Sequence, residues 1–194
     1  MENTIENLGT LANILNEDVN NCHMNLQTED SQFWRRVYIR TCFSGIEAEI
    51  YAFKQIALEQ HEKQGGLFNE GELALLNEHS YDVSDKGEAH TQQKFIQLTK
   101  NIKFAFKAFA RSWSITYEFP ADQGWTSFVA AVKIRNRLTH PKNHDDLTVS
   151  SEDLREVITA NIWFVENTLF LMKAMLPYLK DSTDQTDSGS TESL

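Results

Sequence analysis

The hexapeptide RNRLTH, residues 135–140, contains two side chains that can act together on a phosphate group. An imidazole titrates near neutral pH, so His140 can accept or donate a proton. A guanidinium is planar and permanently charged, so Arg135 can stabilise negative charge that develops on phosphate oxygens. Asn136 offers an amide that orients either of them or satisfies a buried backbone group. The segment therefore suits proton transfer during phosphodiester chemistry.

An amphipathic helix predicted to begin near Trp125 carries this segment and stops at Pro141, because proline cannot continue a helix. At 100° per residue, Arg135 and His140 would lie about 140° apart around that helix. One chain would therefore aim both side chains poorly at a single phosphate. A second copy related by two-fold symmetry could supply the missing group, and fraying of the helix end could also reorient His140.

Three further long helices are predicted from apolar residues that recur every three or four positions. They span about 33–62, 91–113 and 150–177, and Ser150 with Asp153 resembles a capping box for the last one. Glycines at 65 and 66 end the first, and the proline at 177 ends the last. The apolar rows of these helices are expected to face the core. The row of the first helix is Ile39, Cys42, Ile46, Ile50, Phe53 and Ala57; that of the second is Phe95, Leu98, Ile102, Phe106, Phe109 and Trp113; that of the last is Leu154, Ile158, Ile162, Val165, Leu169, Met172 and Leu176.

Shorter elements complete the predicted chain. A short helix within residues 3–19 and a polar connector over 20–30 precede the first long helix. A second short helix is expected over 70–78, followed by a polar connector over 81–88. No alternating strand pattern of useful length is present. The predicted fold class is therefore all-α, a helical bundle of four main helices with short accessory helices.

The acidity of the chain is concentrated at its ends. The formal net charge is -10, but residues 31–180 contain 18 acidic and 18 basic residues and are neutral. Residues 1–30 and 181–194 contain acidic residues and no Lys or Arg. We expect an acidic N-terminal segment over 1–30 with a short helix, and a helical domain over 31–180. The tail 181–194 has no apolar residue before its last leucine and is expected to be disordered.

The segment 135–140 resembles the RNase-type motif of the HEPN domain family, an Arg followed by a polar residue, three further residues and a His. Its context fits, because the motif ends a helix, is closed by Pro141 and precedes a long last helix. The stretches 33–38 and 46–49 also resemble the first long helix of some members. The resemblance covers residues 31–180 in layout, and the motif is its specific part.

This resemblance implies a metal-independent endoribonuclease that acts through the 2'-hydroxyl of RNA. It implies a homodimer that brings two motifs into one cleft, with Arg135, Asn136 and His140 as catalytic residues and no cofactor. Many members are bacterial toxins or defence proteins, so a protein partner such as an antitoxin is expected. Two alternatives stay open: a HEPN-like module that dimerises or binds a protein without turnover, and a nucleotide-binding domain. The chain has no glycine-rich phosphate loop to support the latter.

Two groups of basic residues are candidates for RNA contact. One flanks the motif, and the other forms a stripe at helical spacing on the helix predicted over 91–113. Both are also typical of a solvated helix face. The candidates are Lys133, Arg137 and Lys142 beside the motif, and Lys100, Lys103, Lys107 and Arg111 on the stripe.

Other features limit the function. No apolar run approaches the roughly eighteen residues that a membrane span needs, and the N-terminus does not resemble a secretory signal. We therefore expect a soluble, cytoplasmic protein. Cys22 and Cys42 lack metal-site spacing and are interpreted as free thiols, with Cys42 in the core. The other histidines show no ligand spacing, so no metal site is expected. Glu47 is a candidate partner for Arg135 or a member of a surface ion pair.

Overall fold

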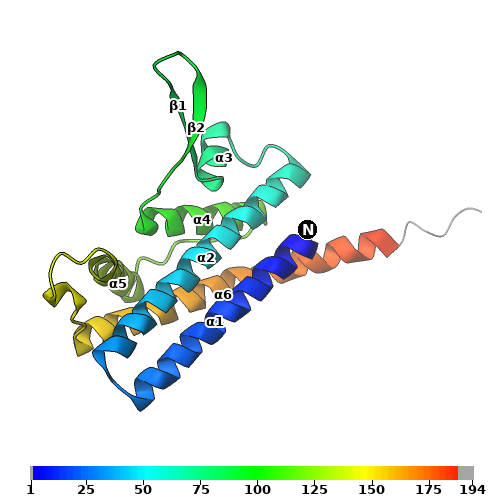
Figure 1. The fold of residues 1–194 in the computed structure, drawn as a ribbon. Helices are drawn as coiled ribbons and strands as arrows, with labels where there is room; N and C mark the ends of the chain where they lie inside the picture. Colours follow the sequence, from blue (N-terminus) through cyan, green and yellow to red (C-terminus); the bar gives the residue numbers. More distant parts are fainter. Residues whose placement is uncertain (1, 188–194) are drawn as a thin grey trace, which may run out of the picture.

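The computed structural model describes residues 2–187, with side chains placed over 6–179. Figure 1 shows a helical bundle from which one antiparallel hairpin stands out. The predicted all-α class is confirmed, and the hairpin is the element that the sequence did not predict. In chain order the elements are α1 (Glu2–Thr28), α2 (Gln32–Gln64), α3 (Glu70–Leu76), β1 (His79–Val83), β2 (Ala89–Gln93), α4 (Leu98–Ser112), α5 (Gln123–Thr139), the 3-10 turn η1 (Asp145–Leu147) and α6 (Ser151–Asp187).

Helix α2 is the centre of the bundle and contacts every other α-helix of the described chain. The Ser31 side chain caps its first turn by accepting a hydrogen bond from the Trp34 N–H. Its end falls at Gly65 as predicted, where the φ of 68° is one that glycine adopts without strain. The predicted apolar row is buried in full and consists of Ile39, Cys42, Ile46, Ile50, Phe53 and Ala57.

Helix α1 is longer than predicted, because it continues to Thr28 and leaves only residues 29–31 as a connector. Leu26 is buried, and Val19 and Cys22 pack against the same core. On α2, Gly45 lies beneath Leu15, so the two helices approach closely. This packing stabilises α1 well beyond its weak sequence pattern, and residues 2–28 therefore share the core of the main bundle.

The β1–β2 hairpin occupies the region where a polar connector and the beginning of a long helix were predicted. Tyr81 pairs with Thr91 and Val83 with Ala89. Its turn contains Gly87, with a φ of 78°. Nearly every hairpin side chain is exposed, so the sequence carries no alternation between a buried and a solvated face. Helix α4 consequently begins at residue 98 rather than 91.

Helix α6 buries a different face from the one predicted. Trp163 and Phe164 are buried against α5, where their rings lie 5.4 Å from Trp125 and 6.4 Å from Phe128. The predicted row is largely exposed, because α6 has two apolar faces and the large rings fit the space beside α5. The most exposed members of that row are Ile162, Leu169, Met172 and Leu176.

The start of α6 was predicted correctly, whereas its end was not. The capping box is present: the Ser150 N–H donates to Asp153 Oδ2 at 2.9 Å, and the Asp153 N–H donates to Ser150 Oγ at 3.0 Å. The helix passes through Pro177, where its end was predicted, and continues to Asp187. A proline removes one backbone donor and kinks a helix without always ending it. Residues 181–187 of the expected disordered tail are therefore helical, and 188–194 lie outside the described residues.

Few other features of the bundle bear on function. Cys42 is buried as predicted, whereas Cys22 is half-buried with its Sγ 3.6 Å from Thr41 Oγ1, and both thiols are free. None of the helices within residues 2–187 has an apolar stretch long enough to cross a membrane. Over the placed side chains, no group of three or more His, Cys, Asp or Glu residues is arranged to hold a metal ion.

Candidate functional site

A cavity of about 560 Å³ lies where α2, α4, α5 and the base of the hairpin meet. Arg135, Asn136 and His140 all line it, which places both ends of the motif in one cavity of a single chain. Glu47 and Tyr51 of α2 line it as well. The structure thus joins the three predicted catalytic residues to a helix more than 80 positions earlier in the chain.

Packing at both ends of α5 fixes the motif. At its start, Asp122 caps the Trp125 N–H at 3.0 Å, and Gly124 packs so closely on Trp163 that an added Cβ would meet that side chain. At its end, Arg40 of α2 donates to the Leu138 carbonyl at 3.0 Å. This bond satisfies one of the carbonyl groups that a helix end leaves without a partner. The helix is therefore anchored before the chain reaches His140.

His140 is the C-cap of α5, and its backbone leaves the helix with φ -126° and ψ 59°. Counting 100° per residue does not apply to a residue outside the helix, which explains why His140 shares a cavity with Arg135. Both side chains line this one cavity, although the helical count separates them by about 140°. The imidazole is exposed and has no hydrogen bond or ion pair to any side chain or backbone group within the described residues. Its nitrogens are therefore free to exchange protons with a ligand.

The Arg135 guanidinium is held from two directions. Its Nη1 donates to Asn136 Oδ1 at 3.1 Å, and its Nη2 forms an ion pair with Glu47 Oε1. The Arg135 side chain is 26% exposed and that of Glu47 is 45% exposed. Because a guanidinium has five N–H donors, others remain for a ligand. Asn136 and Glu47 thus act on Arg135 as positioning residues.

Each of the two carboxylates that line the cavity has its own cation. Glu47 pairs with Arg135, and Glu78 pairs with Lys54, whose side chain is completely buried and also donates to Asn101 Oδ1 at 3.3 Å. Lys94 lines the cavity as well and has no ion pair among the placed side chains. The lining therefore carries no excess negative charge that would repel a phosphate.

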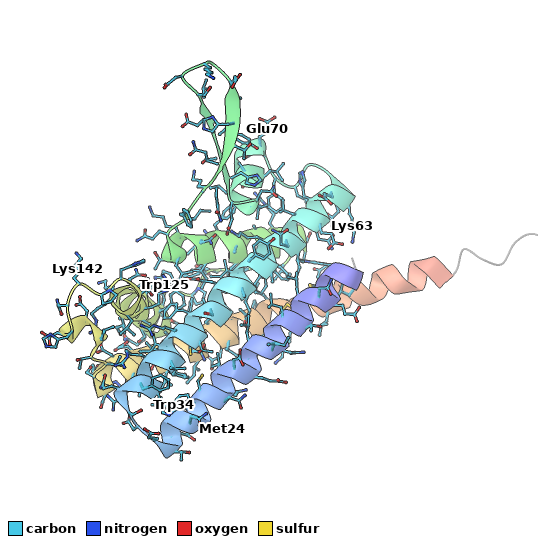
Figure 2. All side chains as sticks on the ribbon, viewed as in Figure 1. Met24, Trp34, Lys63, Glu70, Trp125 and Lys142 are labelled. Atoms are coloured by element: carbon cyan, nitrogen blue, oxygen red, sulfur yellow. The ribbon has the colours of Figure 1, made fainter. Side chains whose placement is uncertain are left out.

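The basic residues predicted beside the motif do not gather in the cavity. Arg137 donates to the Thr148 carbonyl at 2.8 Å and pairs with Asp153 at 3.1 Å, so its guanidinium ties α5 to the start of α6. Lys133 and Lys142 are exposed and do not line the cavity. Figure 2 shows Lys142 at the outer edge of the loop after α5. A ligand bound in the cavity would have to extend well beyond it to contact Lys133 or Lys142.

The predicted basic stripe on α4 lines a second cavity of about 480 Å³. Two of its members already have protein partners. Lys103 Nζ lies 4.6 Å from the Trp125 ring centre, and Arg111 forms an ion pair with Glu72 at 2.7 Å. Lys100 and Lys107 have no ion pair among the placed side chains and remain the free cations of the stripe. The stripe is therefore partly structural.

Sequence reasoning missed several residues of the cavity. Phe95 was assigned to a buried helical row, yet it is 89% exposed and lines the cavity from the segment between β2 and α4. Lys54 and Glu78 meet only because the chain folds back from α2 to the hairpin base. No local pattern signals either feature, since both depend on packing between distant segments.

Comparisons of the chain with protein-family models, with curated proteins and with solved structures found no match. The chemistry of the site is therefore argued from its own residues. It combines an unpaired imidazole, an oriented guanidinium and room for a ligand between them.

Proposed function

We propose that this chain is an endoribonuclease of HEPN type that cleaves RNA without a metal ion. The observation that carries the proposal is the shared cavity of His140 and Arg135. His140 supplies a ring free of protein partners, and Arg135 supplies a positive charge held by Glu47 and Asn136. These are the two functions that cleavage by internal attack requires.

In the proposed reaction His140 accepts the proton of the ribose 2'-hydroxyl. The 2'-oxygen then forms a bond to the adjacent phosphorus as the bond from phosphorus to the 5'-oxygen breaks, and the leaving oxygen takes a proton from water. Arg135 stabilises the negative charge on the non-bridging oxygens. Asn136 contributes by orienting Arg135. The products are one fragment with a 2',3'-cyclic phosphate and one with a 5'-hydroxyl.

The purified chain is expected to cut an end-labelled single-stranded RNA in the presence of EDTA and to leave cyclic-phosphate ends. The measurement is gel electrophoresis of the fragments before and after acid treatment, which opens the cyclic phosphate. Cleavage that appears only when magnesium is added would contradict the mechanism, because no step uses a metal ion. Fragments that end in a free 3'-hydroxyl, without any phosphate, would contradict the mechanism as well.

RNA binding is expected to be weak and transient. Residues 31–180 are neutral overall, and of the predicted contact residues only Lys100, Lys107, Lys133 and Lys142 have a side-chain amine without a partner among the placed side chains. A small number of phosphate contacts gives a shallow dependence of affinity on salt. A role as a toxin or defence protein with an inhibitory protein partner, and a cytoplasmic location, stay predictions from the resemblance and the composition.

A second candidate function, a dimerisation module, is favoured by the exposed face of α6. The apolar stripe on this face repeats every three or four residues without interruption, which is the heptad pattern of a helix that packs along another helix. We propose a second copy of this chain as its partner, with the two α6 helices antiparallel about Asn167. The stripe consists of Ile158, Ile162, Val165, Leu169, Met172 and Leu176; Ile158 and Val165 are half-buried, Ile158 against the core, and the other four are exposed.

In that arrangement Val165 would face Leu169 of the second copy, so Leu169→Glu places a charge at the centre of an apolar contact. The variant is expected to sediment with the mass of one chain where the unmodified protein sediments as a dimer. Phe170→Glu is the matched control, because Phe170 is the next residue and similarly exposed, does not belong to the stripe, and has its ring 6.2 Å from that of Tyr117 in the same chain. A monomeric unmodified protein, or an equal effect of both variants, would remove this proposal.

A further inference from the structure

Phe95 is exposed to solvent and lines the cavity that contains the motif residues. Among the placed side chains no large apolar residue is more exposed, at 89%. It lies in the segment 94–97, which has no regular secondary structure and joins β2 to α4. The ring lines the same cavity as Arg135 and His140. An apolar surface in this place is available to a ligand that also reaches the motif.

The backbone that presents Phe95 is held firmly. The Lys94 N–H donates to the Glu78 carbonyl at 2.7 Å, and the Glu78 carboxylate is paired with the buried amine of Lys54. Two residues after Phe95, the Gln97 carbonyl accepts a hydrogen bond from the Lys100 N–H at 2.8 Å as α4 begins. The exposure of Phe95 is therefore built into the connection and does not depend on a loose loop.

A second aromatic side chain, Tyr51, reaches the same space from α2 and is 46% exposed. Tyr51 also lines an adjoining cavity of about 580 Å³ that follows the hairpin and shares Glu78 and Gln93 with the first. The hollow therefore continues from the motif, past Tyr51, along the hairpin. Two adjoining cavities of about 560 and 580 Å³ provide more room than a single phosphate would need.

The chemistry of this lining fits an unpaired nucleic-acid strand. Aromatic faces stack on nucleobases, and cations such as Lys94 and Arg135 donate hydrogen bonds to phosphate oxygens. The side-chain amides of Gln97 and Asn101 can bond to base edges. A base in a duplex is already stacked on its neighbours and cannot present its face to Phe95. The cations and amides together argue against a purely apolar protein segment as the occupant.

We infer that Phe95 and Tyr51 are base-stacking residues that seat a single-stranded RNA with one of its phosphates at Arg135 and His140. The inference rests on the proposed ribonuclease function for the identity of the ligand. Neither residue takes part in proton transfer. Their contribution is to substrate binding, so substitution is expected to raise KM and leave kcat unchanged.

The test uses a short single-stranded DNA that contains 2-aminopurine, whose fluorescence falls when it stacks on an aromatic ring. DNA lacks the 2'-hydroxyl and cannot be cut by the proposed reaction, so binding is measured independently of catalysis. The unmodified protein is expected to quench the probe. Phe95→Ala should weaken binding about tenfold and reduce the quenching, Phe95→Leu should behave like alanine, and Phe95→Trp should restore both.

Phe33→Ala is the matched control, since Phe33 is 58% exposed near the start of α2 and does not line the cavity. It should leave quenching unchanged. Quenching that depends on Phe95, with no RNA cleavage, would keep the stacking site and remove the ribonuclease function. Cleavage that depends on His140 but not on Phe95 would overturn the stacking site alone. Absence of quenching by the unmodified protein would also overturn it.

Discussion

Replacing His140 with alanine is expected to lower the rate of RNA cleavage by about 100- to 10,000-fold, the usual contribution of a general acid or base. The His140 ring has no partner among the described residues, so its removal breaks no contact on which the fold depends. The thermal midpoint of unfolding should therefore stay within about 1 °C of the unmodified value. The measurement is the single-turnover rate on a labelled RNA, with circular dichroism as the check on folding.

His144→Ala is the matched control, because His144 lies four residues further along and its side chain is 91% exposed, with Nε2 2.9 Å from Asp145 Oδ1. It does not line the cavity and should leave the rate unchanged. Arg135→Ala should lower the rate by about 100- to 1,000-fold, and Arg135→Lys should restore only part of it, since an amine cannot make a bidentate contact. Equal rates for His140→Ala and the unmodified protein would refute the catalytic interpretation.

Glu78→Ala is expected to destabilise the fold by about 3 kcal/mol, because removing one partner of a buried ion pair leaves the other charge buried without compensation. Lys54 is completely buried, and after the substitution only Asn101 Oδ1 would remain to accept from its amine. Because the Glu78 side chain is 31% exposed, the lower end of the usual range applies. For a chain of this size the thermal midpoint should fall by about 6–12 °C.

Lys54→Met separates the cost of a buried charge from the loss of packing. Methionine fills a similar volume, and the remaining Glu78 carboxylate can be hydrated at the hairpin base. We expect this variant to lie within about 1 kcal/mol of the unmodified protein, and the double variant with Glu78→Ala to recover most of the stability lost. A double variant as unstable as Glu78→Ala alone would show that the cost does not come from the amine of Lys54.

The His140→Ala and Glu78→Ala variants test different parts of the proposed site. His140→Ala addresses the reaction and leaves the hairpin in place. Glu78→Ala addresses the base of the hairpin, from which the segment bearing Phe95 is held by the Lys94 N–H bond to the Glu78 carbonyl. A loss of cleavage in both, with a loss of stability only in the second, is the expected combination.

The sequence by itself determined where most of the helices lie. The spacing of apolar residues in α2 predicted its buried row correctly, and Gly65 and Pro141 correctly marked where α2 and α5 end. Caps such as Ser150 with Asp153 were also visible. These features depend on backbone geometry within a few residues, so their physical causes are contained in the local sequence.

For the candidate site, the sequence singled out the motif residues and left open whether Glu47 is a partner of Arg135 or a member of a surface ion pair; in the structure Glu47 pairs with Arg135. It misassigned Phe95, because a residue at helical spacing from an apolar row is expected to be buried. It also grouped Arg137 with the RNA contacts, although that side chain is occupied by the Thr148 carbonyl and Asp153. Composition and spacing do not show which cations already have partners.

Only the tertiary structure decided which face of α6 is buried and how His140 lies relative to Arg135. The fit of Trp163 beside Trp125 selects one of two apolar faces, a choice that periodicity leaves open. His140 shares the cavity with Arg135 because the chain leaves the helix at that residue, where its side chain no longer follows the helical turn. Local spacing specifies the elements, whereas the shared cavity depends on packing between segments far apart in the chain.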